Sequence, residues 1–180
     1  MTYSFFARST FCFSTASLSF SAARSTFAIT AANSSGITDG ASATVLVSEA
    51  EANRRKLKPL ALVIDYAVAG VDPRIMGIGP VPAVRKLLAK TGMRLEQFEL
   101  VELNEAFAAQ VLACLRDLPI DPGHLNVNGG AIALGHPIGC TGTRIVTTLI
   151  HEMQKRKTRY GLATLCISGG MGIALGVERL

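Results

Sequence analysis

The chain has 180 residues, of which 49 % are hydrophobic and 17 % charged, and its formal net charge is +5 at pH 7. That length and apolar content suit one globular domain with a packed core, and no run of about 18 apolar residues predicts a transmembrane helix. The basic residues lack aromatic interleaving and a basic tail, so nucleic-acid binding is not expected. Their clusters are best explained as solvated helix faces, with attraction of a phosphorylated acidic partner as the alternative.

Residues 1–28 differ in composition from the rest of the chain. They are rich in Ser and Phe and contain Arg but no Lys or acidic residue, and the first acid is Asp39. This composition is typical of an organellar transit peptide, which would place the protein in mitochondria. A disordered tail, or non-native sequence from a gene model that begins in the wrong place, explains it equally well and favours a cytoplasmic location. A secretion signal is not expected, because no clean apolar segment is present.

The first predicted elements after this segment are a strand, a helix and a second strand. Residues 43–48 predict a strand with Val45 and Val47 on one face. Residues 49–58 predict a short helix, because acidic side chains come early and basic ones late, as the helix dipole favours. Residues 60–69 are a continuous apolar run of strand length, which predicts a buried strand.

The middle of the chain predicts a helix, a strand and a second helix. Pro82 opens a helix over residues 83–91, and Gly92 is suitably placed to end it. Residues 99–103 predict a short strand, and a helix follows from Asn104 to about residue 118, where prolines stop it.

The last part of the chain predicts a helix and two strands. Apolar residues recur with helical period over residues 145–153, and strands are expected at residues 161–167 and 173–177. The glycine-rich turn at residues 168–172 should make these two strands antiparallel. Strands that alternate with helices along the chain predict a layered α/β domain.

Residues 126–144 form the most informative stretch and read NVNGGAIALGHPIGCTGTR. Its glycines allow close approach to a ligand or to another backbone segment. His136 lies among them, directly before Pro137 and a predicted helix N-terminus, whose N–H groups favour oxygen atoms that carry negative charge. The stretch is not a P-loop, because no Lys follows the glycines, and the glycine spacing does not match a dinucleotide-binding motif.

Three motifs follow one another along the chain: NEAF at residues 104–107, GHPIG at residues 135–139 and CISGGMG at residues 166–172. Together they closely resemble the C-terminal half of the thiolase family, and the resemblance extends over about residues 30–180. It implies an α/β, thiolase-like layered fold with a mixed sheet in a C-terminal domain over residues 58–180. Residues 29–57 would be a remnant of the N-terminal domain and a linker, with most of that domain absent.

The resemblance also implies roles for three side chains in thioester chemistry. An enolate beside a thioester needs donors at its oxygen and a group that moves a proton. By resemblance, His136 donates to that oxygen, Asn104 holds a water that also donates, and Cys166 is the general acid and base. Judged without the family, Asn104 is first of all a helix N-cap, His136 a structural histidine and Cys166 a packed thiol.

Further positions match the family through the backbone or the substrate. The backbone N–H of Ser168 would serve a second oxyanion hole, although many members have Gly there and the serine side chain could crowd the pocket. Ser35 and Phe107 match positions that contact the pantetheine arm of coenzyme A, with a turn residue and a helix core residue as the alternatives. No cofactor is implied, and no metal site is expected, because the cysteine spacing fits neither zinc nor a disulfide framework.

The acyl-accepting Cys of the family belongs to its N-terminal half, and nothing in this sequence matches its surroundings. Cys12 has no context that would lower its pKa, while Cys114 is expected in the core and Cys140 as a small filler. We therefore expect an acyltransferase of the thiolase family, acting by thiolysis or Claisen condensation on acyl-CoA, present as a C-terminal fragment. The alternatives are a non-catalytic acyl-CoA-binding module and a partner subunit for a thiolase-like chain. A full-length member would be expected to form homo-oligomers.

Overall fold

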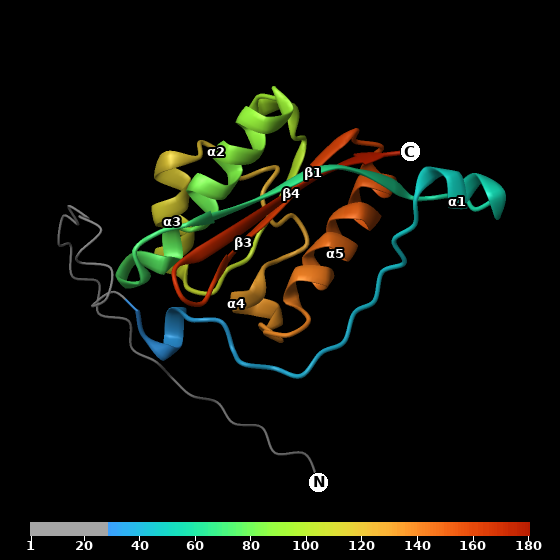
Figure 1. Cartoon of the computed structure of the whole chain (residues 1–180). Coiled ribbons are helices and arrows are strands. Elements are labelled where there is room, and N and C mark those ends of the chain that lie inside the picture. Colours follow the sequence, from blue (N-terminus) through green and yellow to red (C-terminus); the bar gives the residue numbers. More distant parts are fainter. Residues whose placement is uncertain (1–28) are drawn as a thin grey trace, which may run out of the picture.

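The computed structural model describes residues 29–180, so the predicted leader and Cys12 lie outside the described residues. Figure 1 shows the arrangement of the elements. In chain order they are the 3-10 helix η2 (Ala31–Asn33), α1 (Glu49–Arg54), β1 (Ala61–Gly70), η3 (Pro73–Ile78), α2 (Pro80–Thr91), η4 (Leu95–Gln97), β2 (Leu100–Leu103), α3 (Ala108–Asp117), α4 (Ala131–Leu134), α5 (Thr141–Arg156), β3 (Tyr160–Ile167) and β4 (Met171–Arg179).

The four strands form one sheet in the order β1-β4-β3-β2. β2 pairs with β3 in parallel, whereas β4 is antiparallel to both of its neighbours, β1 and β3. The sheet is therefore mixed, as predicted. β3 and β4 form the predicted antiparallel hairpin, in which Cys166 pairs with Gly172.

Helices cover both faces of the sheet. Figure 1 shows α2 and α3 on one side and α5 on the other. Side chains alternate between the two faces of β2, so that Val101 and Leu103 join the core beneath α2 and α3, while Leu100 joins the core beneath α5. Cys114 is fully buried on the α2 side, as expected for a core residue. The predicted α/β layered fold is confirmed.

Two strand predictions need correction. β1 forms where the sequence predicts it, yet it is not buried, because it lies at the edge of the sheet and Leu62 and Tyr66 are 50 % and 57 % exposed. Residues 43–48 do not form a strand, and Val45 is 89 % exposed. β structure needs a partner to satisfy its N–H and C=O groups, and this segment pairs with no strand in the described part of the chain.

The helix boundaries also differ from the predictions. α3 begins at Ala108 rather than Asn104, because the N–H of Asn104 still donates to the carbonyl of Thr164 on β3, at 3.0 Å. Asn104 is therefore not an N-cap, and the alternative that the sequence favoured for it is wrong. α2 and α5 begin earlier than expected, and the short helix α4 was not predicted. Gly92 ends α2 in the left-handed conformation, as expected.

None of the helices in residues 29–180 is long and apolar enough to cross a membrane. Within the same residues, no group of three or more His, Cys, Asp or Glu side chains could hold a metal ion.

Candidate functional site

Asn104 lies directly after β2 and is almost fully buried, with 2 % of its surface exposed. Its backbone continues the pairing with β3, which holds the side chain at the end of the sheet. The side-chain oxygen Oδ1 is buried and has no hydrogen-bond partner. A buried acceptor without a partner costs free energy, so this oxygen marks a place where a water or a ligand group is needed.

His136 contacts Asn104 through Nε2, which lies 3.4 Å from Nδ2 of the amide. Its other nitrogen, Nδ1, lies 2.7 Å from the hydroxyl of Thr141, and that hydroxyl donates to the carbonyl of Pro137 at 3.0 Å. An amide nitrogen only donates, and the Thr141 proton is already used, so Nδ1 carries the ring proton and Nε2 accepts. The imidazole is thus held at both nitrogens.

Burial lowers the pKa of His136 below its ordinary value, and the nearby Arg144 guanidinium lowers it further. The ring is therefore neutral at pH 7. With its lone pair on Nε2, the neutral ring can accept a proton from a thiol, and the resulting imidazolium can donate from the same atom to an oxygen. The predicted pair of Asn104 and His136 is brought together by the fold.

The loop before His136 is held by Glu105, a residue that the sequence analysis did not single out. Its carboxylate accepts from the side chain of Asn126 at 3.0 Å and from the backbone N–H of Ile132 at 3.1 Å. A Cβ at Gly130 would overlap the Glu105 carboxylate, so a side chain there would push the carboxylate away from Asn126 and Ile132. Asn126 in turn bonds to both backbone groups of Leu103 at 2.9 Å. In the sequence, the only sign of this role for Asn126 is its position between two predicted elements and shortly before Gly129 and Gly130.

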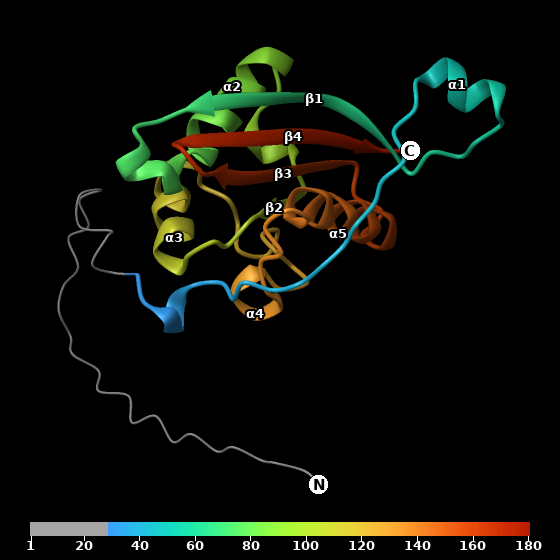
Figure 2. The ribbon, with the colours of Figure 1, turned by 60° about the horizontal axis from the view of Figure 1, so that its bottom comes forward.

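Ser35 and Phe107 are brought close together by an extended segment over residues 34–42, which we call the strap. Ser35 bonds to the carbonyl of Ala106 through its N–H at 3.0 Å and its hydroxyl at 3.1 Å, and Ser34 forms a β-bridge with Phe107. Ser35 is therefore not a turn residue. Figure 2 shows the strap passing beside α4 toward the far end of the molecule.

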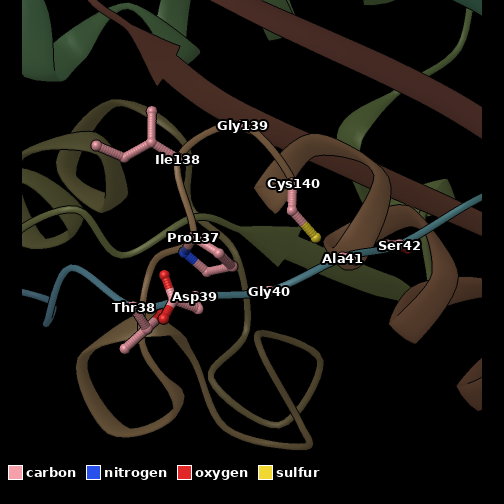
Figure 3. A pocket seen from close by; sticks show the side chains of 9 residues that line it. All are labelled: Thr38, Asp39, Gly40, Ala41, Ser42, Pro137, Ile138, Gly139 and Cys140. Atoms are coloured by element: carbon pink, nitrogen blue, oxygen red, sulfur yellow. The ribbon is translucent and has the colours of Figure 1, made fainter.

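The strap also contacts the His136 loop directly. The N–H of His136 donates to the carbonyl of Gly36 at 2.8 Å, and a Cβ on Gly135 would collide with Thr38. An open pocket of about 310 Å³ lies between the two segments (Figure 3). Its lining consists of Thr38, Asp39, Gly40, Ala41, Ser42, Pro137, Ile138, Gly139 and Cys140. Cys140, expected as a filler, is 9 % exposed and lies at the N-terminus of α5.

Cys166 lies near the C-terminal end of β3, two residues beyond the Thr164 carbonyl that accepts from Asn104. Burial raises the pKa of its thiol, so the thiol is protonated at neutral pH. Ser168 follows in the exposed turn, where Gly169 and Gly170 have positive φ angles of 80° and 84°. The sheet thus brings Cys166 and Asn104 to the same end.

Comparisons with known proteins give matches over most of the described residues. Residues 57–179 match the family model of the thiolase C-terminal domain. The chain is 59 % identical over 152 residues to an acetyl-CoA acetyltransferase of Rhizobium meliloti, a match that covers 84 % of this chain and 39 % of that protein. The chain therefore spans about two fifths of the length of such curated relatives.

Two solved structures are similar in both fold and sequence. Human mitochondrial 3-ketoacyl-CoA thiolase in complex with CoA superimposes with a TM-score of 0.77 at 43 % identity, over 84 % of this chain and 39 % of that one. The acetyl-CoA acetyltransferase of Bacillus anthracis superimposes with a TM-score of 0.73 at 54 % identity, over 74 % of this chain and 34 % of that one.

Proposed function

The chain belongs to the thiolase family, and from this we propose that it supplies the acid/base half of an acyltransferase site for acyl-CoA thioesters. The reaction would be thiolysis of a 3-ketoacyl-CoA or the reverse Claisen condensation of acetyl-CoA. The observation that carries the proposal is the contact between Asn104 and His136, at the same end of the sheet as Cys166.

We assign Asn104 and His136 to the thioester oxygen. A water that donates one proton to the unpartnered Oδ1 of Asn104 can donate its second proton to the thioester oxygen. The imidazolium form of His136 donates from Nε2, so both donors stabilise the negative charge of an enolate. Thr141 and Glu105 act through the ring and its loop, and neither needs to contact the substrate.

We assign Cys166 to proton transfer at carbon. The thiol would first pass its proton to Nε2 of His136, which gives the thiolate and the imidazolium together. The thiolate then removes a proton from the carbon next to the thioester, and the electron pair moves onto the thioester oxygen. The thiol then returns a proton in the reverse direction. The backbone N–H of Ser168 would serve a second oxyanion hole, and the side chain of Ser168 is exposed. Ser35 and Phe107 would contact the pantetheine arm, at the place where the strap meets residue 107.

A second candidate function is that of a partner subunit that completes the site of another chain. It is favoured by Cys114, which is fully buried and whose pKa is raised to about 12 by burial, so that it is unsuited to carry an acyl group. Mixing this chain with a thiolase-like chain that contains the nucleophile would then produce thiolysis. No gain on mixing would count against this candidate.

Deuterium exchange at the methyl group of acetyl-CoA in D2O tests the main proposal, because enolate formation requires no acyl-accepting Cys. We expect exchange above the buffer rate, its loss in Cys166→Ala and a reduction in His136→Ala. The variant Lys155→Ala, on the exposed end of α5, should exchange as the unchanged chain does. A folded chain that binds acetyl-CoA, detected by a raised melting temperature, yet gives no exchange would contradict the proposal.

A further inference from the structure

Glu102 is a buried ionisable side chain that the proposed acyl transfer does not use. It belongs to β2, and 3 % of its surface is exposed. In the parallel pairing of β2 with β3 it lies opposite Ala163, which belongs with Leu100 to the core beneath α5. Side chains two positions apart along a strand share a face, so Glu102 and Asn104 both lie on the face that α5 covers.

Arg144 lies in α5, in the part of the helix that packs near β2. α5 begins at the site with Thr141, which is bonded to the His136 ring, and runs away from it, whereas β2 runs toward it. Arg144 therefore follows Thr141 by about 4.5 Å along the helix axis. The next residue, Ile145, packs in the core beneath α5. Glu102 and Arg144 are thus displaced from the site in the same direction, on elements that face each other.

The guanidinium of Arg144 carries a charge that is not fully bonded. Its Nε and Nη1 atoms are buried, and neither has a hydrogen-bond partner within residues 29–180. Burial raises the pKa of Glu102 to about 7, and the charge of Arg144 opposes this rise. Burial also lowers the pKa of His136, and the same charge lowers it further. Arg144 therefore acts electrostatically on a carboxyl on one side and on the imidazole on the other.

The other charged groups near Glu102 are carboxylates that are held by partners of their own. Glu105 bonds to the loop before His136. Glu152, on α5, accepts from Asn128 at 3.0 Å and from Arg156 at 2.6 Å, and these contacts lower its pKa. Residues 160–167 of β3 contain no charged side chain. Near neutral pH, the change of charge beside Arg144 therefore comes from Glu102.

We propose that Glu102 and Arg144 control how readily His136 accepts a proton in the acyl-transfer reaction. Both are positioning residues, because they act through the imidazole and need not contact the substrate, and the inference rests on the proposed function. When Glu102 is protonated, the charge of Arg144 opposes the imidazolium. When Glu102 is ionised, the two charges offset each other, and the proton of the Cys166 thiol moves more easily to Nε2. Ionisation of Glu102 near pH 7 thus activates the site.

The first test compares deuterium exchange into acetyl-CoA in the unchanged chain and in Glu102→Gln, which stays neutral, from pH 5.5 to 8.5. We expect nearly equal rates at the lowest pH and a rate about tenfold lower in the variant at the highest, because a neighbouring charge shifts a pKa by about one unit or more. Unfolding has the opposite sign, because a raised carboxyl pKa destabilises the unchanged chain as the pH rises.

Two outcomes of this test have different meanings. A ratio of the two exchange rates that is the same at every pH would overturn the inference. The absence of exchange in the unchanged chain would instead contradict the proposed function, and the charge coupling would then be decided by a second test that needs no activity.

The second test follows the Glu102 carboxyl by 13C NMR and the His136 ring by NMR titration in Arg144→Gln. We expect both pKa values to rise, because the lost cation stabilised the carboxylate and opposed the imidazolium. Arg144→Lys keeps the charge and should restore both values. A rise in only one of the two groups would show that Arg144 does not link them and would overturn the inference. Circular dichroism establishes folding, and the exchange ratio of Glu102→Gln decides alone if Arg144→Gln does not fold.

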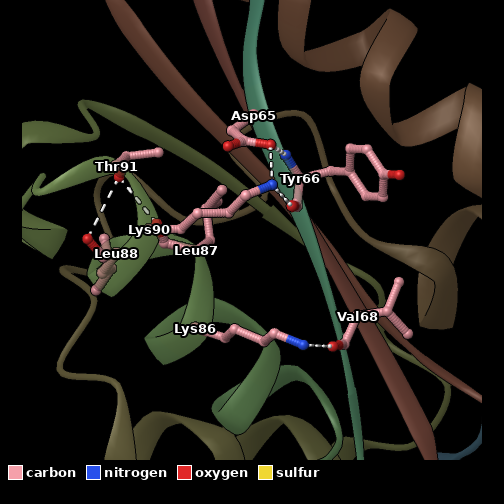
Figure 4. A network of polar contacts seen from close by, with 8 residues as sticks. All are labelled: Asp65, Tyr66, Val68, Lys86, Leu87, Leu88, Lys90 and Thr91. Atoms are coloured by element: carbon pink, nitrogen blue, oxygen red, sulfur yellow. Dashed lines mark hydrogen bonds and ion pairs between the residues drawn. The ribbon is translucent and has the colours of Figure 1, made fainter.

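The matched control is Lys86→Gln, which removes an equal charge from the opposite face of the sheet. Figure 4 shows Lys86 and Lys90 of α2 at the outer edge of β1, where they donate to the carbonyls of Val68 and Tyr66 at 3.0 Å and 3.3 Å. The sheet separates both lysines from Glu102. Both titrations and the exchange rates should therefore stay as in the unchanged chain, and shifts as large as those of the arginine variant would show that net charge alone causes them.

Discussion

The amide of Asn104 and the ring of His136 meet at 3.4 Å, although they are separated by 32 positions in the chain. Two independent supports produce this contact. The sheet holds Asn104 through Thr164, while α5 holds His136 through Thr141. The site therefore depends on the relative position of β2 and α5, which the core beneath α5 maintains.

Replacing Asn104 with aspartate should raise the pKa of His136 by roughly one unit or more, because a carboxylate beside Nε2 stabilises the imidazolium. NMR titration of the His136 ring measures this shift. Asn53→Asp on α1, which Figure 1 places at the far end of the molecule, is the matched control and should leave the pKa unchanged. An identical His136 titration in both variants would show that the two side chains are not in contact in solution.

Arg144→Gln should also raise the pKa of His136, because the Arg144 guanidinium is one of the two causes that lower it. Burial, the larger cause, remains, so the increase should be partial. His124 and His151 report on any general effect of the substitution in the same titration. A fall in the His136 pKa, or a parallel shift of all three histidines, would contradict the assignment.

Glu102 should make the unfolding free energy depend on pH. Burial raises its pKa from 4.5 to about 7, with Arg144 opposing the rise and Glu105 and Glu152 adding to it. A carboxyl whose pKa is raised by folding stabilises the folded chain when the pH is below the pKa of the unfolded chain. This contribution is lost as the pH rises through the folded pKa of about 7. One pKa unit is worth about 1.4 kcal/mol, so the loss is on the order of 3 kcal/mol.

Urea unfolding of Glu102→Gln between pH 4 and 8 measures this contribution. The unchanged chain should lose stability relative to the variant as the pH rises across that interval. Difference curves are needed, because other groups titrate in the same range. A constant difference between the two proteins would show that Glu102 keeps an ordinary pKa.

Gly130→Ala should destabilise the His136 loop by roughly 1–3 kcal/mol, the usual cost of overpacking. The new methyl group would displace the Glu105 carboxylate from Asn126 and Ile132. Gly139→Ala, on the other side of His136, is the matched control, because a Cβ there meets no atom within 4 Å. Urea unfolding compares the two variants, and equal effects would show that Glu105 does not hold the loop.

The α/β order and the antiparallel hairpin of β3 and β4 could be predicted from local periodicity and a glycine turn. The mixed sheet was predicted through the family resemblance that the short motifs carry, and the roles that this resemblance implies for Asn104, His136 and Cys166 stay predictions. The start of α3 was misplaced for a physical reason. An Asn before an apolar helical run looks the same whether it caps the helix or continues a strand pairing, and only the bond from Asn104 to Thr164 decides.

Contacts between distant segments could not be predicted in this way. Ser35 bonds to Ala106 across 71 positions, and no local pattern in either segment indicates the other. The role of Glu105 was missed for the same reason, because it depends on contacts with Asn126 and Ile132, which lie more than 20 positions away in the chain. The exposure of β1 was missed because an apolar edge strand reads like a buried one when charged residues elsewhere in the chain close it.

Cys166 should react slowly with iodoacetamide at pH 7, and its rate should still be rising above pH 9, because burial raises its thiol pKa above the ordinary value of 9.0. Only the thiolate is nucleophilic, so the alkylation rate follows the ionised fraction. Peptide mapping by mass spectrometry separates Cys166 from Cys114, which should react more slowly still, since its pKa is about 12 and it is fully buried. If Cys166 is the base for acetyl-CoA exchange, the exchange rate should rise over the same pH range. Rapid alkylation of Cys166 at pH 7 would mean that a neighbouring group ionises the thiol, and exchange should then already reach its full rate at neutral pH.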